Sequence, residues 1–120
     1  MRLAAMFALL SLAQALSIAG TWSATINSPG GSFAQVFTFH DTGKTLTGTM
    51  VNGRQGTVPL SNIVVQGDQI HFDWIENSQG QNFDWKYAGV IHANEMDLTL
   101  TVPMGGKTIH MIAKRAANAT

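Results

Sequence analysis

The sequence predicts an all-β fold, a single eight-stranded antiparallel up-and-down β-barrel that follows a signal peptide. Seven turn-forming clusters rich in Gly, Asn, Asp and Pro divide the chain after residue 20 into eight short segments. Evenly spaced segments of this length are typical of β-sandwiches and β-barrels. Apolar and polar residues also alternate along most of the segments, which indicates strands with one buried face and one solvated face.

The turn signals and the alternation together place the eight strands. Their ranges are residues 20–27, 32–40, 45–51, 57–65, 69–76, 82–91, 96–102 and 107–115. The rows predicted to face inward are Trp22, Ala24 and Ile26; Phe33, Gln35, Phe37 and Phe39; Leu46, Gly48 and Met50; Ile70, Phe72 and Trp74; Phe83, Trp85, Tyr87, Gly89 and Ile91; and Met96, Leu98 and Leu100.

The segment 57–65 is the weakest of the eight. Pro59 removes a ladder donor, and the residues that follow it do not alternate well, so this segment is either an edge strand or a loop. Connections of two to five residues make neighbouring strands antiparallel. The simplest topology is a meander whose last strand pairs with the first, and such closure removes exposed sheet edges.

The first residues have the three parts of a secretory signal. Met1-Arg2 is a short basic start, residues 3–13 form an apolar run, and Ala13-Gln14-Ala15 supplies the small-x-small pattern for cleavage. The apolar run is shorter than the about 20 residues that a membrane-spanning helix needs. We therefore expect a signal peptide over residues 1–15 and no membrane span.

The mature domain is then residues 16–120, with an alternative cleavage after Ala19. Export predicts a secreted or periplasmic protein. The chain has no Cys, so it uses no disulfides, which fits a bacterial envelope protein better than a small eukaryotic secreted module. Seven basic and seven acidic residues give a net charge of zero without a basic block, so we expect no nucleic-acid partner. We also expect the barrel to be monomeric or weakly associating.

Two residues near the chain ends resemble the arrangement found in calycins, the lipocalins and their relatives. Gly20-Thr21-Trp22 opens the first strand and Lys114-Arg115 ends the last. In calycin barrels a Trp in a Gly-x-Trp motif closes one end, and a basic residue of the final strand packs across it. The resemblance implies these structural roles for Trp22 and Arg115, with the cation on the indole face.

A second resemblance extends over nearly the whole mature chain. The motifs that carry it are Gly20-Thr21-Trp22, Phe37-Thr38-Phe39, Leu46-Thr47-Gly48-Thr49, Gly67-Asp68-Gln69-Ile70 and Ala113-Lys114-Arg115. Together they are similar to a family of small exported bacterial β-barrel domains of unknown function, some free-standing and some fused to secreted hydrolases. The resemblance implies location and fold rather than an activity. The chain also resembles avidin-type barrels, but Ala24 replaces the polar ligand contact expected after the Trp.

The predicted interior is the candidate ligand site. An eight-stranded barrel is either just filled by side chains or holds one small ligand. The small inward residues Ala24, Gly48, Gly89 and Ala113 could leave a cavity or could make room for aromatic bulk, and the sequence leaves both open. For a cavity, the residues expected to line it are Gln35, Phe72, Trp74, Trp85 and Tyr87.

The first functional hypothesis is therefore an exported barrel that binds a largely apolar small molecule without a cofactor. The alternative is a structural or interaction module with a filled core, such as an accessory carbohydrate- or envelope-associated domain of secreted hydrolases. Enzyme activity has no motif to support it: no Gly-x-Ser-x-Gly elbow occurs, and the inward rows contain no Asp, Lys or His. The four histidines lack the spacing of zinc ligands, so we expect no metal site.

The outward face of the hairpin 69–91 carries the remaining charged pattern. A four-residue loop, 78–81, places Asp73 opposite Lys86, whereas a six-residue loop places Asp73 opposite Asp84. The first register gives an ordinary surface ion pair between Asp73 and Lys86, and the second gives two opposed carboxylates. The first register is favoured.

Overall fold

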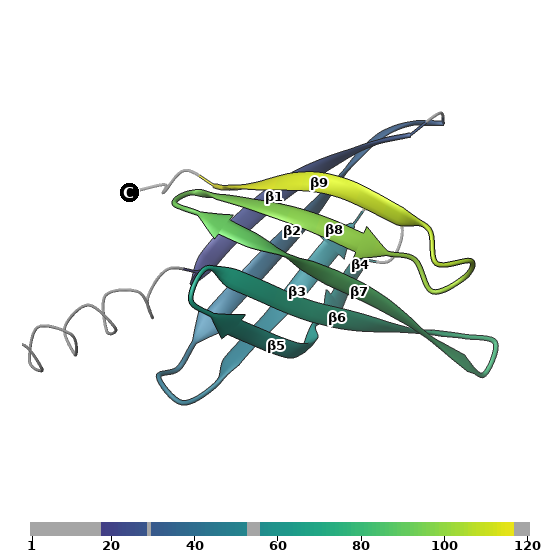
Figure 1. Cartoon of the computed structure of the whole chain (residues 1–120). Helices are drawn as coiled ribbons and strands as arrows, with labels where there is room; N and C mark the ends of the chain where they lie inside the picture. Colours follow the sequence, from purple (N-terminus) through teal and green to yellow (C-terminus); the bar gives the residue numbers. More distant parts are fainter. Residues whose placement is uncertain (1–17, 29, 53–55, 117–120) are drawn as a thin grey trace, which may run out of the picture.

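The computed structural model describes residues 18–28, 30–52 and 56–116, and this part of the chain forms one antiparallel sheet of nine strands (Figure 1). The strands are β1 Gly20–Ser28, β2 Gly31–Asp41, β3 Leu46–Asn52, β4 Gly56–Pro59, β5 Ser61–Gln66, β6 Gln69–Ser78, β7 Gln81–His92, β8 Glu95–Thr101 and β9 Thr108–Arg115. The predicted all-β antiparallel fold is confirmed, and outside the segment 57–65 the strand bounds agree closely with the predicted ones.

The order of strands across the sheet is β4-β3-β2-β1-β9-β8-β7-β6-β5. Seven ladders join strands that follow one another in the chain, and one joins the first strand to the last, β1 to β9, through Trp22↔Arg115 and Ala24↔Ala113. The predicted pairing of the last strand with the first is confirmed.

The predicted closed barrel of eight strands is wrong, because the sheet opens in the middle of the chain. The segment 57–65 contains two strands, β4 and β5, which are the two edges of the sheet and share no ladder among the described residues. Pro59, which has no N–H, ends β4, and Asn62 takes a positive φ of 56° where the β5–β6 register shifts.

One residue, Leu60, connects the two edges and holds them near each other. Its backbone N–H donates to the carbonyl of Gly48 at 2.9 Å, and β5 packs against β3. A Cβ on Gly48 would lie 3.1 Å from the Leu60 side chain and 3.2 Å from Phe39. The side chains of Leu60 and Phe39 therefore fill the space beside Gly48, and no cavity remains at this position.

The core lies inside the curl of the sheet and follows the predicted inward rows. Its largest fully buried side chains are Trp22, Tyr87, Phe37, Phe39, Phe72, Met50, Ile70, Met96, Leu98 and Leu100. Edge-to-face and stacked ring contacts connect strands from both halves of the sheet, with Phe37 5.4 Å from both Phe72 and Tyr87 and Phe72 4.8 Å from Tyr87. These contacts hold the two halves together where no ladder closes the sheet.

Residues 1–17 lie outside the described part of the chain, and the predicted signal peptide falls within them. The first described residue, Ile18, is buried against the core. In the described part, no helix has the length and apolar character needed to cross a membrane.

Candidate ligand site at the distal end

The two ends of the curled sheet differ. The turns β1–β2, β6–β7 and β8–β9 lie at one end, which we call the distal end; in Figure 1 they are on the side away from the end of β9, with the β1–β2 and β6–β7 turns pointing in different directions. At the other end lie the first residue of β1 and the last residues of β9. The predicted ligand residues belong to the middle and distal parts of the inward face.

Trp22 and Arg115 lie at the end opposite the distal end. The Arg115 guanidinium carbon is 4.2 Å from the centroid of the buried Trp22 ring. The Trp22 indole N–H donates to the carbonyl of Ile18 at 2.9 Å, and Arg115 Nη1 donates to the carbonyl of Ala19 at 2.7 Å. These contacts fix the start of β1 against the end of β9.

Gln35 and Tyr87 meet in the interior although 52 residues separate them in the chain. Tyr87 donates its hydroxyl to Gln35 Oε1 at 2.9 Å. Only 6% of Gln35 and 1% of Tyr87 is exposed, so this is a buried polar contact between β2 and β7. Such a bond specifies how the two halves of the sheet meet, because breaking it would leave a polar group without a partner in the core.

Trp74 continues this polar arrangement toward the distal end. Its indole N–H is buried and makes no hydrogen bond within the described part of the chain. Burial raises the pKa of Tyr87 to about 12, and the side chains of Gln35 and Trp74, which can turn an N–H toward the phenolate, partly offset that rise. Tyr87 is therefore a neutral hydrogen-bond donor at physiological pH.

Trp85 lies directly opposite Trp74 on the next strand, and their rings stack with centroids 5.7 Å apart and planes within 10°. The Trp85 indole N–H donates to Glu76 Oε1 at 3.0 Å. Glu76 is half-buried because it continues the inward row of β6, two residues after Trp74. Glu76 is not among the ligand residues expected from the sequence, although alternation from Trp74 places it on the inward face.

Phe72 has a different environment from the two tryptophans. It is fully buried between Phe37, Phe39 and Tyr87, with ring centroids 5.4, 5.5 and 4.8 Å away. Phe72 stacks against the Tyr87 ring and is fully buried, so it has no exposed surface that could contact a ligand.

The apolar inward rows become accessible at the distal end. Phe33, opposite the buried Ile26, is 46% exposed, and Phe83 and Trp85 are half-buried. These three side chains have the inward parity of core residues, but they are not covered as core residues are. Phe33 lies toward the distal end of β2, and Phe83 and Trp85 lie toward the distal end of β7; we call these three residues the distal rim.

The two inward glycines do not open a cavity between the predicted ligand residues. A Cβ on Gly89 would lie 1.9 Å from the backbone carbonyl oxygen of Asp97, so Gly89 allows β7 and β8 to approach closely. A hollow of about 140 Å³ does occur on β5, β6 and β7, where Gly89 lines it together with Val64, His71 and Ala88 among others. It does not include the predicted ligand residues.

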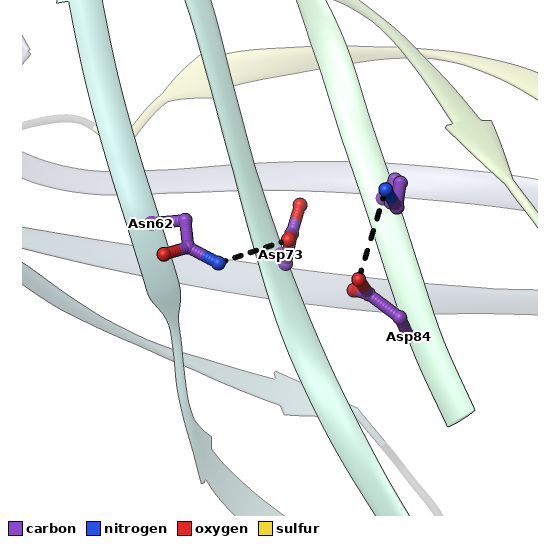
Figure 2. A network of polar contacts seen from close by, with 4 residues as sticks. Asn62, Asp73 and Asp84 are labelled. Carbon is purple, nitrogen blue, oxygen red and sulfur yellow. Dashed lines mark hydrogen bonds and ion pairs between the residues drawn. The ribbon is translucent and has the colours of Figure 1, made fainter. Parts of the chain in front are cut away.

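Figure 2 shows the polar residues on the outward face of β5, β6 and β7. The predicted register is confirmed, with Asp73 opposite Lys86, but the predicted ion pair is wrong. Lys86 lies 3.8 Å from Asp84 on its own strand, and Asp73 accepts a hydrogen bond from Asn62 at 3.2 Å. Partial burial, with the nearby Asp73 carboxylate, raises the pKa of Asp84.

The described histidines lie on the exposed surface, where His110 pairs with Asp97. Among the described residues there is no group of three or more His, Asp or Glu side chains placed to hold a metal ion. The candidate site is built from aromatic rings, the amide of Gln35, the indole N–H groups of Trp74 and Trp85, the Tyr87 hydroxyl and the Glu76 carboxylate.

Comparison of the chain with protein families, with curated proteins and with solved structures finds no match.

Proposed function

We propose that the protein binds a small, largely apolar molecule at the distal rim. The observation that carries this proposal is the change in burial along the inward aromatic rows, from fully buried rings in the middle of the sheet to the exposed Phe33 and the half-buried Trp85 at the distal end. Apolar surface of this kind, next to a few oriented polar groups, is the usual composition of a small-molecule site.

Among the predicted ligand residues, Trp85 is the one that a ligand would touch first. Trp74 and Gln35 lie deeper, Tyr87 orients Gln35, and Phe72 supports Tyr87. Because rings already fill the middle of the core, the ligand sits at the end of the sheet rather than deep inside it.

We also propose that the protein is exported, secreted or periplasmic, and calycin-like. The support for export is the sequence of residues 1–15, and the support for the resemblance is the contact between Trp22 and Arg115. An up-and-down barrel that opens at one point, between β4 and β5, would be a variation of the calycin arrangement.

Native mass spectrometry of the protein exported by a bacterial host, before any refolding or removal of lipid, tests ligand binding. We expect a bound mass that disappears on denaturation. Trp85→Ala should lose this mass, whereas Ile75→Ala, which changes an exposed residue on the outward face of the same hairpin, should retain it. A protein without bound mass in all three forms contradicts the proposal.

A second candidate is a filled-core interaction module, such as an accessory carbohydrate- or envelope-associated domain. The ring contacts among Phe37, Phe72 and Tyr87 and the tight packing around Gly48 favour it. A protein without bound mass that is nevertheless retained on bacterial cell-wall polysaccharide would support this second candidate.

A further inference from the structure

The hydrogen bond between Tyr87 and Gln35 leaves N–H donors of Gln35 unused. Tyr87 gives its proton to Gln35 Oε1, which uses the acceptor of the amide and leaves its two N–H donors. Within the described part of the chain, no hydrogen bond from the Gln35 amide nitrogen is formed. The arrangement therefore ends in donors that have no acceptor.

Trp74 adds a second donor of the same kind. Its indole N–H makes no hydrogen bond of ordinary geometry, although it lies close enough to the Tyr87 hydroxyl to lower the pKa of that group, and only 4% of the residue is exposed. A buried N–H without an acceptor is costly, and native proteins usually satisfy such a group with a protein atom, water or a ligand. The Trp74 N–H is thus a buried donor without an acceptor, and the spare N–H donors of the largely buried Gln35 lie on the same inward face.

The charge near the site limits what the acceptor can be. Glu76, half-buried two residues beyond Trp74, is a carboxylate, so an anionic head group would be repelled. A neutral oxygen has no such penalty. An ammonium group has no lone pair for the N–H donors to bind.

Resting on the proposed function, we infer that the ligand of the distal rim carries a neutral carbonyl oxygen, as in a ketone, ester or amide, which Gln35 and Trp74 bind by their N–H groups. The apolar part of the ligand then lies against Phe33, Phe83 and Trp85. Because the Trp74 nitrogen is buried, the half-buried Trp85 ring that stacks on it moves aside when the oxygen enters.

Isothermal titration of the full mature protein with three probes of equal chain length, 2-decanone, decanoate and 1-decylamine, tests this inference. We expect 2-decanone to bind at least about tenfold more tightly than either of the others, the difference expected from one buried hydrogen bond. Equal affinity for all three overturns the inference but leaves apolar binding intact. Binding of none contradicts the proposed function as well.

Gln35→Glu should change which head group the site prefers, from the ketone toward the amine. Glutamate keeps the shape and the acceptor for Tyr87 but has no N–H. The affinity for 2-decanone should therefore fall about tenfold, and the affinity for 1-decylamine should rise. Gln81→Glu, an exposed residue at the same end, makes the same charge change without touching the donors and should leave the ranking unaltered. An unchanged ranking in Gln35→Glu overturns the inference.

Trp74→Phe removes the second donor and keeps an aromatic ring. The affinity for 2-decanone should fall and the affinity for 1-decylamine should stay the same. Circular dichroism confirms that each variant is folded. Equal weakening of both probes would mean that Trp74 acts only through packing, which contradicts its role as a donor.

Discussion

At the scale of single residues, the contact between Tyr87 and Gln35 shows how a polar group is accommodated in an apolar core. Alternation in the sequence places both residues inward, but it does not show which residue across the sheet will be the partner. That depends on how far the sheet curls, which brings β2 and β7 face to face. The sequence therefore predicts the polar residues of the site and not the bond between them.

Tyr87 provides the first residue-scale prediction. It is the only tyrosine in the chain, so the ultraviolet absorbance of tyrosinate reports on it alone. Because its pKa in the folded protein is raised to about 12, the folded protein holds this proton while the unfolded chain, with an ordinary pKa near 10, releases it. The stability from the neutral phenol is fully present below about pH 10 and is lost as the pH rises toward 12. A spectrophotometric titration that showed ionisation near pH 10 without unfolding would contradict the burial of Tyr87.

Asp84 provides the second. Its raised pKa means that the ionised form is less stable in the folded protein, so the stabilising contribution of the proton is present at acid pH and is lost as the pH rises through the folded pKa. Asp84→Asn, which mimics the protonated group, should therefore raise the free energy of unfolding at pH 7. The gain should vanish below about pH 4, the ordinary range of aspartate. Urea denaturation of both proteins across this range measures the effect, and a gain that persisted at acid pH would have another cause.

At the scale of strands, the alternation and the turn residues were sufficient to find nearly every element. The sequence left two registers open for β6 and β7, and the favoured one, with a four-residue loop 78–81, is the register observed. The ion pair on that hairpin was not predictable, since Lys86 reaches Asp84 along its own strand as easily as it reaches Asp73 across the ladder. Surface ion pairs are worth little, so the register does not depend on which is formed.

The sequence shows part of the reason why the predicted strand 57–65 is divided into β4 and β5. Pro59 and the poor alternation after it indicated an irregular segment. That Leu60 would point inward and separate two strands depends on the space beside Gly48, which is a property of the folded sheet. For this reason the sequence could not distinguish an open sheet from a closed barrel.

Gly89 provides the prediction at this scale. Gly89→Ala places a methyl group against the Asp97 carbonyl oxygen, a backbone atom that can move only if β7 and β8 separate. We expect a loss of about 1 to 3 kcal/mol in the free energy of unfolding, measured by chemical denaturation. Gly30→Ala, where a Cβ meets open space, is the control and should have little effect. Equal stability of the two variants would show that β7 and β8 tolerate separation at this point.

At the scale of the whole molecule, the start of the domain depends on residues that precede the first strand. Ile18 is buried, its carbonyl accepts the Trp22 N–H, and the Ala19 carbonyl accepts Arg115. Cleavage after Ala15 would keep these contacts, whereas cleavage after Ala19 would remove them.

A protein that begins at Gly20 should therefore be less stable than one that begins at Leu16 by at least about 2 kcal/mol, from the lost burial of Ile18 and the unsatisfied Trp22 N–H. Denaturation of the two proteins measures the difference, and N-terminal sequencing of the protein produced from the full chain in a bacterial host tests whether it is cleaved and at which residue. Equal stability would mean that Ile18 and Ala19 are dispensable.

The position of the β1–β9 ladder has a consequence for folding kinetics. Every other ladder joins strands that are consecutive in the chain and can form as a local hairpin, whereas this one must bring together the two ends. Since contacts between distant residues slow folding, joining the termini and opening the chain at Leu60 would yield a circular permutant that is a sequential meander from β5 to β4. That permutant should fold faster than the natural chain, with the last step of folding moved from the ends of the chain to its middle.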